Sequence, residues 1–300
     1  MKKLNVYQVD SFTRTKFSGN PAGVVVNADG LTEEQMLLIA RELNNSETAF
    51  LISPENDDYD CEVRYFTPKT EVPTCGHATI AAMYVKALEE KLTSCFLRIK
   101  TKIGILPIEI IKGKNDYQVI MAQSSFELGP VFDDRTVQRL LKALGIAYSD
   151  LDNKCPVQIA STGHPKVIIG IKSREKLNRL NPDYYSLTRL SKQIKCNGFF
   201  VFTFDTDEKD ILTCGRIFAP VIGINEDPVT GNANGPLGGY LIYHGIIKNH
   251  KNYFEFNSKQ GEAMKRPGIV TVRVRMENNE PPSIQIMGDA VVIFRTEITI

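Results

Sequence analysis

Residues 75–79 read CGHAT, and the run IAAMYVKAL follows at residues 80–88. Between residues 78 and 88 only Thr79 and Lys86 are clearly polar, so no narrow apolar stripe follows the helical period of about 3.6 residues. A helix that is apolar nearly all round must be enclosed on nearly all sides. The stretch therefore predicts a buried central helix, although alone it is typical of any buried helix that begins at a glycine.

The start of this helix has features of a binding site. Pro73 and Thr74 form a helix-start pair, and Gly76 lets another group approach the backbone closely. The first N–H groups of a helix have no partners within the helix, and the helix dipole is positive at that end. An anion such as a substrate carboxylate would accept hydrogen bonds from these N–H groups and would be stabilised by the positive end of the dipole.

A second copy of the pattern indicates an internal duplication. The spacing R-x-F-x-P occurs at residues 64–68 and again at 216–220, GNP at 19–21 corresponds to GHP at 163–165, and the glycine-opened run at Gly76 corresponds to one at Gly231. The three landmarks keep their order, with offsets of 152, 144 and 155 residues, respectively. Offsets this long indicate duplicated domains, because the repeats of solenoids are far shorter.

The second buried helix has its own start and stop signals. Proline is tolerated in the first turn of a helix, so Pro236 predicts a start between Gly231 and Gly235. Gly245 is suited to the position just after the last helical residue.

Strands outnumber helices in each half. We predict helices at residues 31–43, capped by Thr32, and at 134–144, and one or two surface helices within 173–195. The predicted strands include residues 4–9, 23–26, 49–52, 62–66, 103–111, 157–160, 166–171, 198–204, 211–218, 253–256, 269–275, 283–287 and 290–300.

These elements predict an α+β fold of two pseudo-symmetric domains, each a curled, mostly antiparallel sheet or barrel around a central buried helix. The expected domains are residues 1–128, which may also receive the C-terminal strand, and residues 129–300, with the active-site cleft between them.

Composition excludes several classes of protein. The 36 basic and 35 acidic residues are dispersed and give a formal charge of +1, which does not suit a nucleic-acid surface. No apolar run approaches the ~20 residues of a membrane-spanning helix, and Gln8 and Asp10 interrupt the N-terminal segment before a signal-peptide core. The 6 cysteines have no paired spacing, which predicts reduced thiols and a cytoplasmic location.

The first candidate catalytic residue is Glu47. It lies at the start of a predicted strand, and the corresponding place in the second half is occupied by residues 197–199 (NGF), which include no carboxylate. A carboxylate in one copy only suits an asymmetric general acid/base. The alternative is an ordinary surface glutamate at the end of a strand.

The other candidates cluster at the two helix starts. We expect Gly76 with His77, and Gly231 with Asn232, to bind the substrate, although His77 could equally serve as a helix cap. Pro228 holds Asp227 extended just before the second helix, which would aim its carboxylate at the substrate unless it lies in a surface turn.

Cys75 could act as a thiolate at a helix start. However, Val229 and Thr230 stand where a two-thiol racemase needs its second cysteine, which argues against that mechanism. There is no glycine-rich nucleotide fingerprint or phosphate loop, and the 4 histidines show no metal-ligand spacing. The sequence therefore predicts neither nucleotide nor metal.

Five motifs follow one another along the chain: GNPAG at residues 19–23, SETAF at 46–50, RYFTP at 64–68, CGHAT at 75–79 and EDPVTG at 226–231. Together they resemble the PhzF-like (phenazine biosynthesis) family over essentially the whole chain. The segment DPVTGNANGP at 227–236 is similar to the YddE-type subgroup of uncharacterised isomerases. The resemblance implies the diaminopimelate-epimerase-like fold and a cofactor-free isomerase, usually a homodimer.

The resemblance also implies roles for individual residues. Glu47 matches the glutamate that shuttles a proton on dihydro-hydroxyanthranilate, and Gly76, His77 and Asp227 match functional positions. Asn232 stands where the phenazine enzyme has serine, which argues against that substrate. We therefore expect an isomerase that moves a proton on a small carboxylate-bearing metabolite. The alternatives are a single-base amino-acid racemase or epimerase, and a non-catalytic small-molecule-binding protein.

Overall fold

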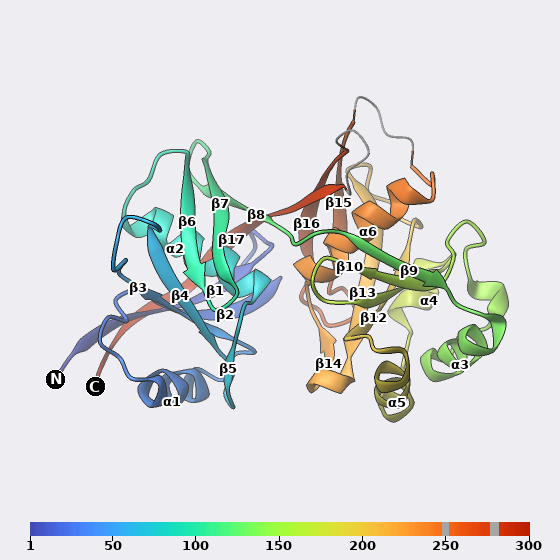
Figure 1. The fold of residues 1–300 in the computed structure, drawn as a ribbon, viewed down its shortest axis with the longest axis horizontal. Coiled ribbons are helices and arrows are strands. Elements are labelled where there is room, and N and C mark those ends of the chain that lie inside the picture. Colours follow the sequence, from blue (N-terminus) through green and yellow to red (C-terminus); the bar gives the residue numbers. More distant parts are fainter. Residues whose placement is uncertain (248–251, 277–281) are drawn as a thin grey trace. The chain divides into compact units, whose positions relative to one another are not determined.

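The computed structural model of the protein describes residues 1–247, 252–276 and 282–300. The chain forms two compact units: residues 1–122 together with 287–300, and residues 123–286 (Figure 1). The first unit thus ends a few residues before the predicted boundary at residue 128. The reason is that β9 (Glu127–Val131) pairs with β10 (Gln158–Ser161) of the second unit.

The first unit is a closed barrel. Its pairings run from β1 through β2, β3, β4, β6, β7 and β8 to β17, which pairs with β1 again. The eight strands are β1 (Lys3–Ser11), β2 (Asn20–Val25), β3 (Thr48–Ile52), β4 (Cys61–Phe66), β6 (Cys95–Thr101), β7 (Gly104–Lys112), β8 (Tyr117–Ala122) and β17 (Ser283–Thr299). The short strand β5 (Glu71–Val72) pairs with β4.

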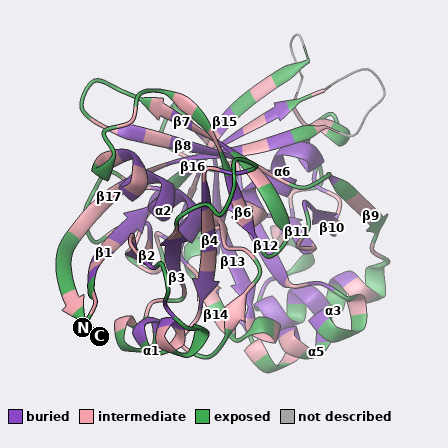
Figure 2. Ribbon diagram, turned by 60° about the vertical axis from the view of Figure 1, so that its left-hand side comes forward, coloured by how far each residue is buried: buried purple, intermediate pink, exposed green. Residues whose placement is uncertain are grey.

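Helix α2 (Gly76–Glu89) is the enclosed helix that the sequence predicts. Ten of its 14 residues are buried, and it contacts β1, β2, β3, β7 and β8 (Figure 2). Burying a side chain such as Met83 or Val85 contributes about 1.5–3 kcal/mol each, so this helix supplies much of the unit's core.

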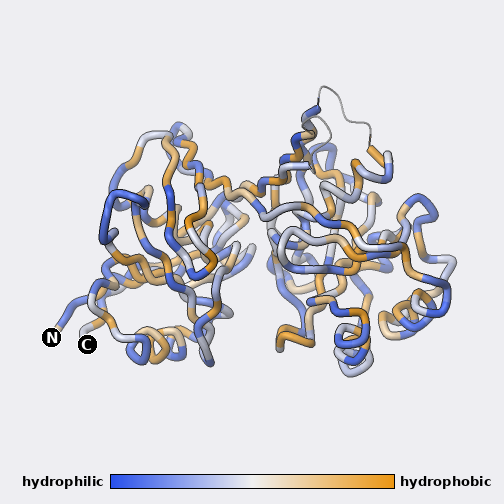
Figure 3. The backbone as a smooth tube through the Cα atoms, in the orientation of Figure 1, coloured by the Kyte–Doolittle hydropathy of each residue, from blue (hydrophilic) through white to orange (hydrophobic). Residues whose placement is uncertain are grey.

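Helix α1 (Glu33–Leu43) lies on the outside of the first unit. Thr32 caps it as predicted, because its hydroxyl accepts the Gln35 N–H while the Gln35 side chain accepts the Thr32 N–H. Hydrophilic and hydrophobic residues alternate along it (Figure 3), and Met36 and Ile39 are on its buried face.

The second unit repeats the order of pairings. In the first unit β2–β3 and β4–β6 are parallel, and in the second β11–β12 and β13–β15 are parallel at the corresponding places, with antiparallel pairs between them. Its remaining strands are β11 (Lys166–Gly170), β12 (Gly198–Thr203), β13 (Ile211–Ala219), β14 (Ile224–Asp227), β15 (Tyr253–Gln260) and β16 (Gly268–Arg275). This match in topology supports the duplication inferred from the motifs.

The outer helices of this unit are α3 (Asp134–Leu144), α4 (Arg174–Asn178) and α5 (Tyr184–Ile194), which fall where helices were predicted. Apolar residues of α3 and α5, including Leu140 and Leu187, pack in one core cluster with residues of the sheet.

Helix α6 (Gly231–Tyr243) is the second enclosed helix, with ten of its 13 residues buried. It starts within the predicted interval, but Pro236 lies beyond the first turn. A Cβ on Gly239 would come within 2.6 Å of the Phe126 ring, so glycine is needed for this close packing. Gly245, with φ of +61°, terminates the helix as predicted.

The C-terminal strand differs from the prediction. We predicted two strands at residues 283–287 and 290–300, but β17 is continuous through Gly288. A Cβ on Gly288 would lie 2.6 Å from Phe12, which explains the small residue. One strand therefore begins in the second unit and completes the barrel of the first.

The repeated R-x-F-x-P motif builds the same ion pair twice. Arg64 donates from Nε and Nη2 to both carboxylate oxygens of Glu71, at 2.8 and 2.7 Å. Arg216 makes the equivalent pair with Glu226, at 2.7 Å for both bonds. Each guanidinium also lies over the phenylalanine two residues later, at 5.2 and 4.9 Å from the ring centre. The motif is therefore structural.

Candidate active site

Glu47 lies immediately before β3 and is half-buried. Its backbone carbonyl accepts the Gly23 N–H at 3.2 Å, which fixes the chain at the edge of the parallel pair β2–β3. Its Oε2 lies 3.4 Å from Nε2 of His77, and the two side chains are 13% and 9% exposed. A carboxylate and an imidazole, both largely sheltered from water, therefore meet at one point.

His77 is held in the first turn of α2 by its backbone and its ring. The Ser11 hydroxyl donates to the His77 carbonyl at 2.8 Å. The ring contacts the Ser46 hydroxyl through Nε2 at 3.2 Å, and Nδ1 lies 3.4 Å from Sγ of Cys75. Thus residues from two distant motifs, SETAF and CGHAT, converge on one imidazole.

The start of α2 is left without a side-chain cap. Its N-cap residue is Cys75, directly after the Pro73–Thr74 pair that marks the helix start, and the Cys75 side chain makes no capping hydrogen bond. The Thr79 hydroxyl donates to the Cys75 carbonyl at 2.7 Å and also meets the Tyr65 hydroxyl at 2.7 Å. The fold thus fixes the helix start, and the side chain of the N-cap residue makes no capping hydrogen bond to the N–H groups of the first turn.

Asp227 ends β14 in the second unit and is half-buried. The Thr230 hydroxyl donates to its carboxylate, and the side-chain amide of Gln260 donates to its backbone carbonyl at 2.9 Å. The Thr230 N–H donates to Oε1 of Gln260 at 3.2 Å. The turn at Pro228 is therefore locked by hydrogen bonds and holds the aspartate beside the start of α6.

Gly231 and Asn232 form the first residues of α6, which also has no side-chain cap. Oδ1 of Asn232 is buried and has no hydrogen-bond partner among the described residues, and the same is true of Oδ1 of Asn234. A buried acceptor without a partner costs roughly 1–3 kcal/mol. A ligand that donates a hydrogen bond would remove that cost at Asn232.

The place in the second unit that corresponds to Glu47 is taken by Asn197. It immediately precedes β12, and its backbone N–H donates to the Pro165 carbonyl at 2.8 Å. Its side-chain amide lies 3.5 Å from Nδ1 of His164. The second unit thus presents an amide where the first presents a carboxylate.

Lys166 is a residue that the sequence reasoning missed. It begins β11, directly after the GHP motif, and is only 3% exposed. Burial lowers the pKa of its amine to about 8, although the nearby Cys196 and Asp227 oppose this effect. Burial and the charge of Lys166 together also lower the pKa of His164. The available signal was a single lysine at the start of an otherwise apolar strand.

Lys166→Met is expected to stabilise the protein at pH 7. Lowering the pKa from 10.5 to about 8 corresponds to a cost of about 3 kcal/mol while the amine is charged. The cost is fully present below pH 8 and disappears toward pH 10.5, because the unfolded chain binds more protons in that interval. Chemical denaturation between pH 7 and 10.5 should show the variant's advantage shrinking. A constant advantage would contradict the explanation, and exposed Lys192→Met is the control.

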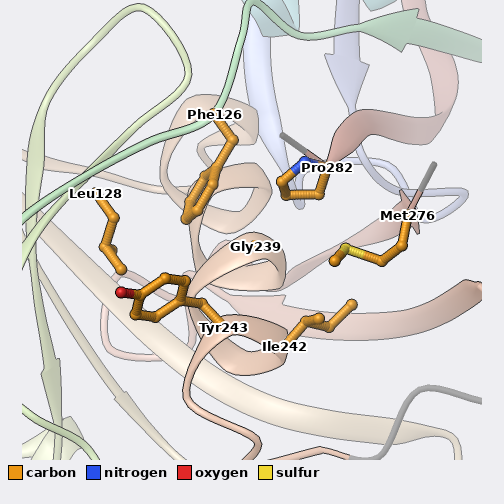
Figure 4. Close-up of a pocket in the computed structure, with 7 residues that line it drawn as sticks. All are labelled: Phe126, Leu128, Gly239, Ile242, Tyr243, Met276 and Pro282. Carbon is orange, nitrogen blue, oxygen red and sulfur yellow. The ribbon is translucent and has the colours of Figure 1, made fainter. Parts of the chain in front are cut away.

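Two pockets are present on the described part of the second unit. The apolar one in Figure 4 is lined by Phe126, Leu128, Gly239, Ile242, Tyr243, Met276 and Pro282. The more polar one is lined by Ser124, Ser125, Glu127, Leu128, Gly129, Ile159, Ser161, Gly163 and Pro165. Neither includes a predicted site residue, and the polar one borders the GHP motif.

Comparison with known proteins identifies the family. The family model described as "Phenazine biosynthesis-like protein" matches residues 9–296. The chain belongs to this family. It is 54% identical over 300 residues to an uncharacterised isomerase of Clostridium acetobutylicum, covering 100% of this chain and 99% of the relative. It is 43% identical to the uncharacterised isomerase YddE of Escherichia coli, covering 98% of each.

A relative with a named reaction also matches. The trans-2,3-dihydro-3-hydroxyanthranilate isomerase of Pseudomonas chlororaphis is 30% identical, covering 97% of this chain and 98% of the relative. The solved phenazine biosynthesis protein of Bacillus anthracis, from the PhzF family, superimposes with a TM-score of 0.91 at 33% identity, covering 100% of both chains. The predicted α+β fold and the membership of an isomerase family are confirmed. No helix of the described residues is long and apolar enough to cross a membrane.

Proposed function

We propose that this member of the phenazine biosynthesis-like family is a cofactor-independent isomerase that moves a proton on a small carboxylate-bearing substrate. Glu47 is the general acid/base. The supporting observation is the 3.4 Å approach of its Oε2 to Nε2 of His77 in a largely enclosed position. A carboxylate held in this way needs no other group in order to take a proton from carbon and return it.

The reaction requires no oxidant or reductant. Glu47 removes a proton from one carbon of the substrate, and the C–H electron pair shifts into the adjoining π system of the substrate. The carboxyl exchanges this proton with solvent and then protonates a second carbon. His77 orients the Glu47 carboxylate and is itself held by Ser46 and by the α2 backbone. The uncapped N–H groups at Gly76 suit the substrate carboxylate.

The second unit, considered by itself, presents groups of different chemistry at the start of its central helix. Asp227 can accept hydrogen bonds from an amine or hydroxyl, and Asn232 offers a buried acceptor that lacks a partner among the described residues. Gly231, which is buried at the start of α6, has no side chain that would keep a ligand from its backbone. Taken by themselves, these groups of the second unit suit a ligand that carries an amine or a hydroxyl.

The proposal is tested by incubating the protein with a panel of small carboxylates in heavy water. The panel comprises trans-2,3-dihydro-3-hydroxyanthranilate and the common amino acids in both configurations. Mass spectrometry should find deuterium at carbon in a substrate that is converted without any added cofactor. Conversion only after addition of a nucleotide or metal would contradict the proposal.

Cys75→Ser is expected to leave most of the activity in place. Its Sγ lies beside Nδ1 of His77, whereas Glu47 approaches Nε2. Steady-state kinetics on the substrate found above would measure the effect, with circular dichroism as a check of the fold. A loss of several orders of magnitude in a folded variant would show that the thiol takes part in proton transfer.

A further inference from the structure

The Glu47 site also assembles three donors of different chemical classes. One ligand atom each from Glu47, Cys75 and His77 lies within 4.8 Å of the other two. Only Cys75 and His77 are close in sequence, so the prediction from histidine spacing that there is no metal site could not detect this set. Thiolate, imidazole and carboxylate together are the donors that Zn²⁺ binds in proteins.

Two of the three donor distances are close to those of a tetrahedral metal site, and the third, between Glu47 and Cys75, lies within 4.8 Å. Bond lengths of about 2.3 Å to sulfur and 2.0–2.1 Å to nitrogen or oxygen place the donor atoms about 3.3–3.6 Å apart in a tetrahedron. Nε2 of His77 lies 3.4 Å from Oε2 of Glu47 and 4.0 Å from Sγ of Cys75. The two distances to His77 therefore need to change by only a few tenths of an ångström, whereas the Glu47–Cys75 distance, which lies within 4.8 Å, would shorten by up to about 1.3 Å through side-chain movement.

The surroundings of the three donors also suit a divalent cation. The backbone of Cys75 is held by Thr79, and that of His77 is held by Ser11, so two ligands are already positioned. Among the described residues, His77 is the only ion-pair partner of Glu47, so no lysine or arginine competes for its carboxylate. A thiolate and a carboxylate together balance two positive charges. The positive end of the α2 dipole repels a cation at this place, so we expect the affinity for the metal ion to be modest.

We propose that Glu47, Cys75 and His77 form an inhibitory site for a thiophilic divalent cation of the Zn²⁺ type. Binding takes a lone pair from each donor, releases the Cys75 thiol proton to solvent and changes no oxidation state. The metal occupies the Glu47 oxygen that would accept the substrate proton, so the ion blocks turnover. The inhibitory effect rests on the proposed function, whereas the binding itself does not.

Cobalt titration tests the binding without any substrate. Co²⁺ added to protein pretreated with chelator should produce a thiolate-to-cobalt charge-transfer band and the visible bands of a four-coordinate site, at one ion per chain. Zn²⁺ should displace the cobalt and abolish both. Loss of a direct ligand in Cys75→Ser or Glu47→Gln should weaken binding by more than roughly 100-fold. Cys95→Ser, at the other half-buried cysteine, should leave the titration unchanged.

Absence of the charge-transfer band in the wild-type protein, or its persistence in folded Cys75→Ser, would overturn the site. The inhibition is measured separately. Zn²⁺ should abolish wild-type proton exchange, a chelator should restore it, and Cys75→Ser should resist Zn²⁺. If cobalt binds at the three residues but Glu47→Gln keeps its turnover, the metal site stands and the proposed role of Glu47 fails.

Discussion

Glu226→Gln is expected to destabilise the protein by about 3–5 kcal/mol, because it leaves the Arg216 guanidinium buried without its counter-charge. Arg216 is only 6% exposed, and both of its hydrogen bonds to a charged partner go to Glu226. Its Nη1 donates hydrogen bonds to the carbonyls of Leu177 and Leu180, so the side chain cannot turn toward solvent without breaking them. Thermal unfolding should show a fall of roughly 10 °C in Tm.

The duplicated motif provides a matched control in the first unit. Glu71→Gln removes the partner of Arg64, but that guanidinium is 21% exposed and keeps Glu33 at 3.0 Å. We therefore expect the loss at Glu71 to be clearly smaller than the loss at Glu226. Equal losses would show that desolvation of the arginine does not set the cost.

Glu47→Gln is expected to lower turnover by ~10²–10⁴-fold, the usual contribution of a positioned general acid/base. The amide keeps the shape and the hydrogen-bonding reach of the side chain but removes the group that accepts the proton, so substrate affinity should change little. Steady-state kinetics should show the loss in kcat, with KM nearly constant. Ser46→Ala is the control, because the Ser46 hydroxyl contacts the same His77 nitrogen at 3.2 Å but, unlike a carboxylate, does not serve as the proton acceptor. It should retain activity to within about tenfold of the wild-type protein.

The sequence predicted the parts of the fold that depend on local pattern. The apolar residues around Met83 and Leu237 require enclosure whatever surrounds them, so α2 and α6 were found from composition and from their opening glycines. The capping of α1 by Thr32 depends on residues three apart in sequence and was equally visible. The repeated motifs predicted the duplication because their order and spacing are visible in the sequence, and in both copies the motif arginine forms an ion pair with a glutamate.

Features that depend on distant partners were not predictable. The continuity of β17 is set by its pairing with β1 and β8, which no local pattern encodes. The boundary near residue 122 likewise depends on the pairing of β9 with β10. Glu71 and Glu226 could be recognised as partners of the motif arginines only once β5 and β14 were placed. Lys166 looked like one polar residue at a strand end, and its burial follows from the sheet that encloses it.

The candidate site was predicted residue by residue but not as an assembly. Glu47, His77 and Asp227 were selected by motif and by position, and the structure adds the contact between Glu47 and His77. The approach of Cys75 to the same imidazole was missed, because the sequence reasoning considered the thiol only as a possible base. Spacing along a chain identifies ligands on one helix and misses those contributed by separate elements.

The measurement that most directly tests Glu47 as the proton carrier is substrate proton exchange in heavy water, with the wild-type protein and Glu47→Gln compared at saturating substrate. We expect the wild type to incorporate solvent deuterium at the reacting carbon, and the variant to bind the same substrate but exchange ~10²–10⁴-fold more slowly. Exchange at the wild-type rate in the folded variant would contradict this role and would make His77 or Asp227 the candidate acid/base.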